Sequence, residues 1–159
     1  AYTGNGGLLK DYNGAGIHHI SNRELLTCAC DVFVPAALEN QIDAEIAAEM
    51  QCKFIVEGAN GPTTAAADKI LEQRGIVLVP DIFANSGGVI VSYFEWVQNI
   101  QELTWEREQV NEMLEKLMTK AFAALYETAQ EKHCTLRMGA YVVALQRLID
   151  AEVIKGLFP

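Results

Sequence analysis

The stretch that most restricts the fold covers residues 54–88 and reads FIVEGANGPTTAAADKILEQRGIVLVPDIFANSGG. Two short apolar runs in it, at 53–56 and 76–79, each give way to a polar turn rich in glycine, asparagine or proline. Between the runs, Thr63 or Thr64 can cap a helix that continues to Arg74, and Gly75 is well placed after the helix end. Strand, helix and strand in this order predict neighbouring parallel strands.

The same alternation extends along most of the chain. Ser21 and Glu24 form a capping-box pattern before two leucines, which indicates a short helix. The unbroken apolar runs are typical of a parallel sheet covered on both faces. The expected elements are that first helix, strands at 32–34, 53–56 and 76–79, helices at 43–50, 63–74 and 89–99, and two long amphipathic helices that begin at Thr104 and Thr135.

The pattern therefore predicts a single α/β domain over residues 1–159 with a C-terminal helical tail. The last helix is expected to end at Gly156. Six of its side chains are expected to face inward, namely Met138, Tyr141, Val142, Leu145, Leu148 and Ile149.

Composition excludes several classes of partner. The formal net charge of −9 and the absence of a basic stripe argue against nucleic acid. No segment reaches the about 18 apolar residues of a membrane span, and no leader sequence is expected. The four cysteines form no CxxC pair, and adjacent His18 and His19 have no ligand partner nearby in sequence, so we expect free thiols, no metal site and a cytoplasmic location.

Three polar stretches follow predicted strands, at residues 35–40, 57–62 and 85–89. In open parallel sheets, ligands bind beyond the carboxyl ends of the strands. Small residues there let a ligand approach the backbone, and Asn60 and Asn85 each offer a donor and an acceptor, which suits an amide or a ribose. The alternative is that glycine, asparagine and proline only shape the turns. Glu57 at a strand end has either a functional role or a solvated or capping one.

Several long motifs in order identify a family resemblance. CDVFVPAALENQI (30–42), FIVEGANGPTT (54–64), VPDIFANSGGVIVSYFEWVQN (79–99) and LRMGAYVVALQRLIDAEVIKGLFP (136–159) resemble the coenzyme-binding domain of the Glu/Leu/Phe/Val dehydrogenases. SYFEWVQN favours the glutamate branch. The resemblance covers residues 21–159 and implies a partial Rossmann-like parallel sheet with flanking helices.

The resemblance also implies a reaction and a set of site residues. The reaction is oxidative deamination of L-glutamate to 2-oxoglutarate and ammonia, with hydride passing to NAD or NADP. It implies that the dinucleotide lies against Ala36, Ala37, Asn60 and Asn85. Val89 and Ser92, three positions apart on one helical face, would shape the substrate pocket. No residue of this chain is implied to be catalytic.

Two departures from the family pattern limit what this chain is expected to do. The glycines at 4, 6, 14 and 16 do not complete a GxGxxG fingerprint, and none follows a convincing strand. The family's substrate domain, with its catalytic lysine and acid/base aspartate, has no counterpart, so the chain resembles an incomplete NAD(P)-binding domain. We therefore expect no turnover and weak dinucleotide binding. The alternative is a non-catalytic nucleotide-binding or oligomerising remnant.

The same departures predict self-association. A doubly wound sheet without its usual first strand leaves an open edge beside residues 32–34, and the last helix lacks its usual partner domain. We expect homo-oligomers, in the form of a two-fold dimer that buries about 1,600 Å² or more.

Overall fold

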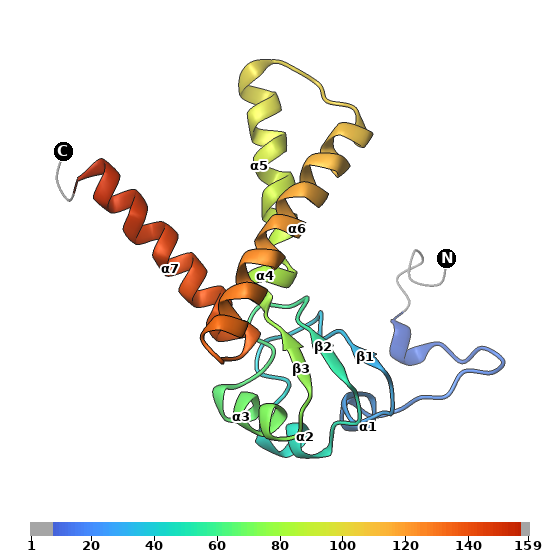
Figure 1. Cartoon of the computed structure of the whole chain (residues 1–159). Coiled ribbons are helices and arrows are strands. Elements are labelled where there is room, and N and C mark those ends of the chain that lie inside the picture. The colour runs from blue at the N-terminus through green and yellow to red at the C-terminus, as the bar shows by residue number, and fades with distance from the viewer. Residues whose placement is uncertain (1–7, 157–159) are drawn as a thin grey trace.

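A three-stranded parallel sheet forms the centre of the computed structural model, which describes residues 8–156. The strands lie in chain order, as β1 (Val32–Phe33), β2 (Phe54–Val56) and β3 (Val77–Val79). The crossovers contain α2 (Ala44–Glu49) and α3 (Ala65–Gln73) (Figure 1). The predicted α/β architecture with a parallel sheet is confirmed.

Local capping chemistry sets the helix boundaries in this part of the chain. Ser21 and Glu24 form the predicted capping box of α1 (Asn22–Leu26). The side chains of Asp43 and Thr64 accept hydrogen bonds from the first turns of α2 and α3. Gly75 has a φ of 71°, a left-handed conformation that glycine adopts without strain, and it turns the chain from α3 into β3.

The two faces of the sheet differ in how they are covered. On one face, Phe33, Ile55 and Leu78 pack with α2 and α3. The core there consists of Leu26, Ile42, Ile46, Ala47, Met50, Cys52, Ile55, Ala67, Leu71 and Ile76. On the other face, the register partners Val32, Phe54 and Val77 are 51%, 44% and 42% exposed. The expectation that both faces are covered is therefore wrong within the described residues.

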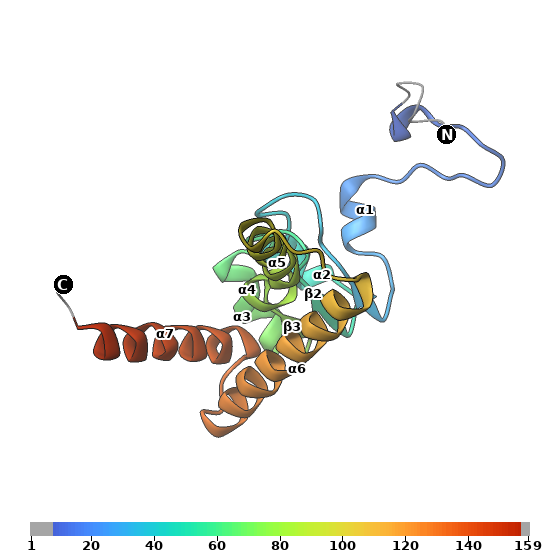
Figure 2. The same cartoon turned by 90° about the horizontal axis from the view of Figure 1, so that it is seen from above.

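Four helices follow β3 and make up a region we call the helical half (residues 81–155). They are α4 (Asp81–Ala84), α5 (Ser86–Gln101), α6 (Arg107–Glu131) and α7 (Leu136–Lys155). We call residues 22–79, from α1 to β3, the sheet lobe. Helices α5 and α6 form a hairpin that rises from the sheet, and α7 extends away from both (Figures 1 and 2).

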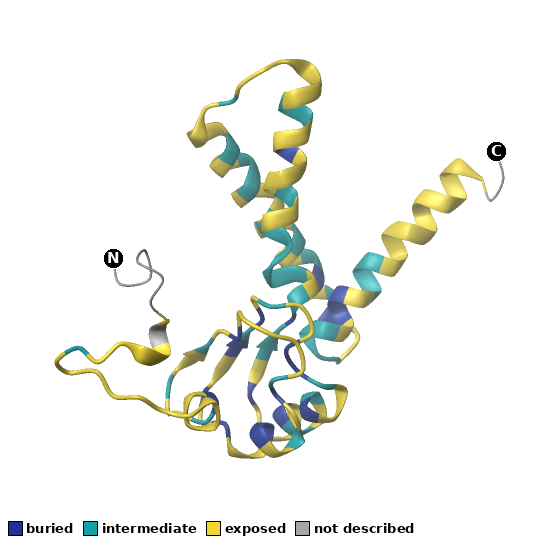
Figure 3. Ribbon diagram, turned by 180° about the vertical axis from the view of Figure 1, so that it is seen from behind, coloured by how far each residue is buried: buried dark blue, intermediate teal, exposed yellow. Residues whose placement is uncertain are grey.

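Burial in α7 differs from the prediction. Only Gly139 and Ala140 are buried, and Met138, Tyr141, Leu145, Leu148 and Ile149 are exposed (Figure 3). Helix α6 begins at Arg107 rather than Thr104, because Glu106 and Gln109 form a capping box. The predicted end of α7 at Gly156 is confirmed.

The crossing of α6 and α7 is unusually close. A Cβ added to Gly139 would lie 2.7 Å from the carbonyl oxygen of Leu125 and 3.0 Å from the Cβ of Ala129. Leu125 and Ala129 are the buried residues of α6, so the two helices meet at the points where both are buried. Glycine is required there because any side chain would force the helices apart.

The segment before α1 runs away from the sheet in both views of the ribbon (Figures 1 and 2). It contains a short 3-10 helix, η2 (Leu9–Asp11). The glycines at 4 and 6 lie outside the described residues. Within residues 8–156, no strand pairs with the outer edge of β1, and no helix is long and apolar enough to cross a membrane.

Candidate functional site

Three loops meet at the carboxyl edge of the sheet, where the sequence predicted a ligand site. The backbone N–H groups of Gly58 and Ala59 donate to the carbonyl oxygen of Pro35 over 3.0 and 2.8 Å. The N–H of Asn40 donates to the carbonyl oxygen of Gly61 over 2.8 Å. These bonds join the loops after β1 and β2 into one surface.

Glycine is needed at two positions of the loop after β2. A Cβ on Gly58 would lie 3.1 Å from the Cβ of Ala36, so the two loops touch along their backbones. Gly61 has a φ of 55°, and its N–H donates to Oδ2 of Asp81 over 2.8 Å. The glycines therefore serve the close approach of three chain segments.

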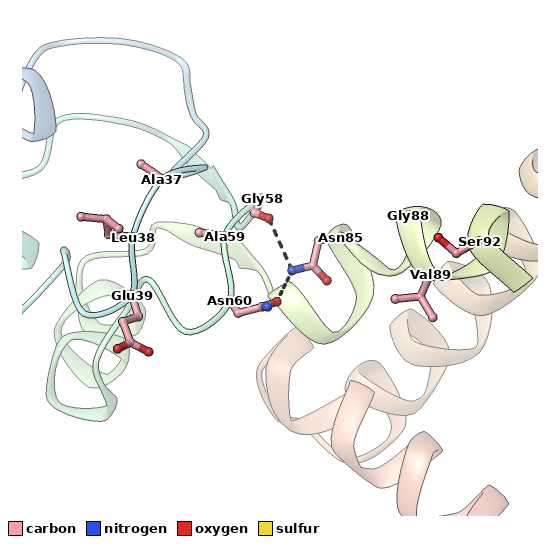
Figure 4. Close-up of a pocket in the computed structure, with 10 residues that line it drawn as sticks. All are labelled: Ala37, Leu38, Glu39, Gly58, Ala59, Asn60, Asn85, Gly88, Val89 and Ser92. Atoms are coloured by element: carbon pink, nitrogen blue, oxygen red, sulfur yellow. Dashed lines mark hydrogen bonds between the residues drawn. The ribbon is translucent and has the colours of Figure 1, made fainter.

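The two predicted asparagines are hydrogen-bonded to each other. Nδ2 of Asn85 donates to Oδ1 of Asn60 over 2.6 Å, and it lies 3.4 Å from the carbonyl oxygen of Gly58 (Figure 4). Asn85 stands at the junction of α4 and α5, but its side chain caps neither helix. Its amide is directed instead toward the loop after β2.

The prediction of a turn at residues 85–88 is wrong. Asn85 has helical backbone angles, φ −97° and ψ −2°, so α5 begins directly at Ser86 and includes both glycines. A Cβ on Gly87 would lie 3.7 Å from Cδ1 of Leu114 on α6, an ordinary contact. The helix thus packs on α6 at Gly87 and continues through both glycines despite their weak helix propensity.

A cleft of about 740 Å³ opens between these loops and α5. It brings together five of the six predicted site residues, which are Ala37, Asn60, Asn85, Val89 and Ser92 (Figure 4). The sixth, Ala36, is not among the lining residues and packs against Gly58. The sequence reading did not name Leu38, Glu39, Gly58, Ala59 and Gly88 as lining residues, although all lie within the motifs it quoted.

Beneath the cleft lies a cluster of charged side chains that the sequence reading missed. Arg137, in the first turn of α7, donates from Nη2 to Oε1 of Glu57 over 2.8 Å. It also contacts Asp68, with Nε 2.7 Å from Oδ2, and Asp81, with Nη1 3.3 Å from Oδ1. The Glu57 side chain is 0% exposed, so the solvated role considered for it is wrong.

The cluster holds three carboxylates around one guanidinium, and the pKa values reflect this. Burial raises the pKa of Asp68, assisted by the charges of Glu57 and Asp81, and outweighs the opposing hydrogen bond and charge of Arg137. For Arg137, burial acts to lower the pKa, but hydrogen bonds and charges of Glu57 and Asp68 together raise it above its usual range. The guanidinium therefore stays charged.

The sequence profile of the Glutamate/Leucine/Phenylalanine/Valine dehydrogenase family matches residues 2–156. The chain belongs to this family. The cryptic catabolic NAD-specific glutamate dehydrogenase of Bacillus subtilis (strain 168) is 50% identical over 137 residues, 86% of this chain and 32% of that protein. The NADP-specific glutamate dehydrogenase A1 of Halobacterium salinarum is 48% identical over 154 residues, 96% of this chain and 37% of that protein.

Solved structures of glutamate dehydrogenases share the fold. The hetero-hexameric glutamate dehydrogenase of Thermus thermophilus in its leucine-bound form gives a TM-score of 0.88 at 31% identity, over 99% of this chain and 36% of that one. The glutamate dehydrogenase of Peptoniphilus asaccharolyticus gives a TM-score of 0.74 at 46% identity, over 79% of this chain and 32% of that one. This member of the Glu/Leu/Phe/Val dehydrogenase family thus spans about a third of the length of these relatives.

The family assignment agrees with the chemical character of the cleft. Of the 10 lining residues, only Glu39 carries an ionisable side chain. The others present small or apolar surface, two amides and one hydroxyl. Such a lining can bind and orient an uncharged polar group, but it offers no lysine for proton transfer.

Proposed function

We propose that this chain is a single, incomplete NAD(P)-binding domain of a glutamate dehydrogenase. The whole protein would deaminate L-glutamate oxidatively to 2-oxoglutarate and ammonia in the cytoplasm. The observation that carries the proposal is the cleft that gathers Ala37, Asn60, Asn85, Val89 and Ser92. Relatives named NAD-specific and NADP-specific match comparably well, so both coenzymes remain candidates.

The lining fits the nicotinamide and ribose end of such a coenzyme. The backbone at Gly58 and Ala59 carries little or no side chain, so a flat ring can approach it closely. Asn60 and Asn85 can exchange their mutual hydrogen bond for bonds to a carboxamide or a ribose hydroxyl. When bound, the coenzyme supplies the hydride acceptor, and these side chains orient it.

The pyrophosphate of the coenzyme has no such counterpart in the cleft. No lysine or arginine belongs to the lining, and the lining contains no GxGxxG turn. We therefore propose that this chain binds dinucleotide weakly, with a dissociation constant of about 1 mM or weaker.

Val89 and Ser92 are proposed to contact the amino-acid substrate. Both project from the same face of α5 at one end of the cleft (Figure 4). The Ser92 hydroxyl can donate to the distal carboxylate of glutamate, and Val89 can pack on its methylene groups. Without a lysine and an acid/base carboxylate at this end, we propose that the chain alone does not turn over glutamate.

Chemical-shift mapping tests the coenzyme proposal. Adding NADH or NADPH should shift the backbone amide signals of residues 58–60 and 85–92 and leave those of α3 unchanged. Asn85→Leu should weaken the binding, because it removes the amide at the centre of the cleft. The control is Asn99→Leu, which changes an exposed asparagine on α5. Shifts centred elsewhere, or equal effects of the two variants, would contradict the proposal.

Self-association is a second proposal, and it is favoured by exposed apolar side chains in two places. They lie on α7, at Leu145, Leu148 and Ile149, and on the open face of the sheet, at Val32 and Phe54. Copies of the chain would bury such surface by pairing. Sedimentation at high micromolar concentration should show a dimer, and Leu145→Lys should weaken it. A clean monomer under those conditions would overturn this proposal.

A further inference from the structure

Hydrogen bonds connect the charged cluster beneath the cleft to the two chain segments that carry Asn60 and Asn85. Oε2 of Glu57 accepts the backbone N–H of Asp81 over 2.8 Å, which joins the end of β2 to the start of α4. Oδ2 of Asp81 accepts the N–H of Gly61, the residue after Asn60. Oδ1 of Asp81 accepts the N–H of Ile82 over 2.8 Å, within α4, the helix that Asn85 directly follows.

These bonds place two carboxylates between the loop of Asn60 and the helix of Asn85. A buried carboxylate without a partner of opposite charge loses its hydration with nothing to compensate for it. The two carboxylates can therefore stay in that position only if a cation balances their charge. Arg137 is the one cation that ion-pairs with Glu57, Asp68 or Asp81 among residues 8–156. Its side chain is 16% exposed, so water screens these pairs little.

The guanidinium group of Arg137 orients its carboxylate partners as well as neutralising them. It is a planar fork, and its three nitrogens reach three different carboxylates at the ends of β2, α3 and α4. A lysine ammonium in the same place could neutralise one carboxylate but could not span all three. The direction of the fork therefore fixes where Glu57 and Asp81 lie relative to each other.

We propose that Arg137 is a positioning residue of the cleft: by orienting Glu57 and Asp81, it holds Asn60 and Asn85 at hydrogen-bonding distance from each other. Its effect on coenzyme binding rests on the function proposed above. Its effect on the two asparagines does not, because their hydrogen bond exists without coenzyme.

A set of variants of the full chain separates positioning from simple support of the fold. Arg137→Met removes the charge and keeps the length of the side chain. Arg137→Lys keeps the charge and loses the fork. Arg147→Met makes the same change as the first at an exposed arginine on the same helix and serves as the control.

The first measurement is the ¹H–¹⁵N spectrum of the asparagine side-chain amides. Arg137→Met should move the amide signals of Asn60 and Asn85, Arg137→Lys should move them less, and Arg147→Met should leave them in place. Unchanged Asn60 and Asn85 signals in a folded Arg137→Met chain would overturn the proposal.

The second measurement uses the double variant Arg137→Met with Glu57→Gln, which leaves no unpaired charge at Glu57. If Arg137 only neutralises Glu57, the double variant should regain both stability and the wild-type amide signals, which would overturn the proposal. If Arg137 positions the cleft, stability should return only in part, because Asp68 and Asp81 still lack their cation, and the signals should stay displaced. If Arg137→Met alone does not fold, comparing the double variant with wild type still tests the proposal.

The third measurement is affinity for NADH and NADPH by calorimetry. The double variant should bind about three- to tenfold more weakly than wild type, the effect of a misplaced hydrogen-bonding group. Absence of binding by wild type would contradict the proposed function and leave the spectral test of Arg137 intact. If wild type binds the coenzyme and the double variant binds it equally well, the proposed positioning role of Arg137 would be contradicted.

Discussion

The sheet lobe and the helical half of this chain both carry many apolar side chains but differ in how much they bury. All ten residues of the hydrophobic core cluster lie in the sheet lobe. In α5, α6 and α7 together, the buried residues are Phe94, Leu125, Ala129, Gly139 and Ala140. The difference shows that an apolar stripe marks the side of a helix that gains from burial without saying what covers it.

Truncating one leucine in each region should give the largest contrast. Leu71 is buried in the core cluster, so Leu71→Ala should lower the free energy of unfolding by about 2–5 kcal/mol. Leu148 is exposed on α7, so Leu148→Ala should change it by no more than about 0.5 kcal/mol. Urea denaturation at low protein concentration measures both.

A large loss for Leu148→Ala would mean that another surface covers α7 in solution. Repeating the measurement over a range of protein concentrations would identify a second copy, because only then does stability depend on concentration.

Glycine substitutions should sharpen the contrast within the helical half. Gly139→Ala should destabilise the chain by about 1–3 kcal/mol, because the new methyl group meets the Leu125 carbonyl oxygen. Gly88→Ala should stabilise it by about 0.5–1 kcal/mol, because the added Cβ meets no other part of the chain within 4 Å and a helical glycine is replaced. Hydrogen exchange should show the loss in α6 and α7 and not in α3. Stabilisation by both changes would mean that the close helix crossing is absent in solution.

The smallest expected effect concerns pH and the cluster that joins the two regions. Burial raises the pKa of Asp68 above its ordinary value of 3.8, so the folded chain binds this proton more tightly than the unfolded chain. The contribution of Asp68 to stability is thus fully present below pH 3.8 and is lost as pH rises through the folded-state pKa. The stability of Asp68→Asn relative to wild type should therefore increase over that range.

Urea denaturation at a series of pH values above 3.8 tests this expectation. Asp150→Asn on the exposed part of α7 controls for the change in net charge. A relative stability of Asp68→Asn that instead falls as pH rises would mean that attraction to Arg137 outweighs burial.

Local signals in the sequence were enough to predict the sheet lobe. Ser21, Asp43 and Thr64 begin their helices as predicted, because each side chain bonds a backbone N–H within its own first turn. The strands also follow from short apolar runs. The motifs that suggested the family likewise predicted residues that the fold brings into one cleft, although their binding roles stay predictions.

The features that the sequence reading missed depend on contacts between distant segments. The helical start at Ser86 depends on packing against α6, and the exposure of Leu145 and Leu148 depends on surface that no helix of the described chain covers. Arg137 gave no signal, because it is a single arginine near the start of a helix. Its three carboxylates are 56 to 80 positions away.

The distance between Glu57 and Arg137 along the chain also has a consequence for synthesis. The two residues are 80 positions apart, and a ribosome that adds about 5–20 residues per second takes about 4–16 s to travel between them. Once β3 has been added, the nascent sheet lobe has its strands and core but still lacks the arginine that balances Glu57. We expect the Glu57 side chain to stay hydrated until Arg137 emerges, so the loop of Asn60 and the helix junction at Asn85 should be among the last parts of the chain to become ordered during translation.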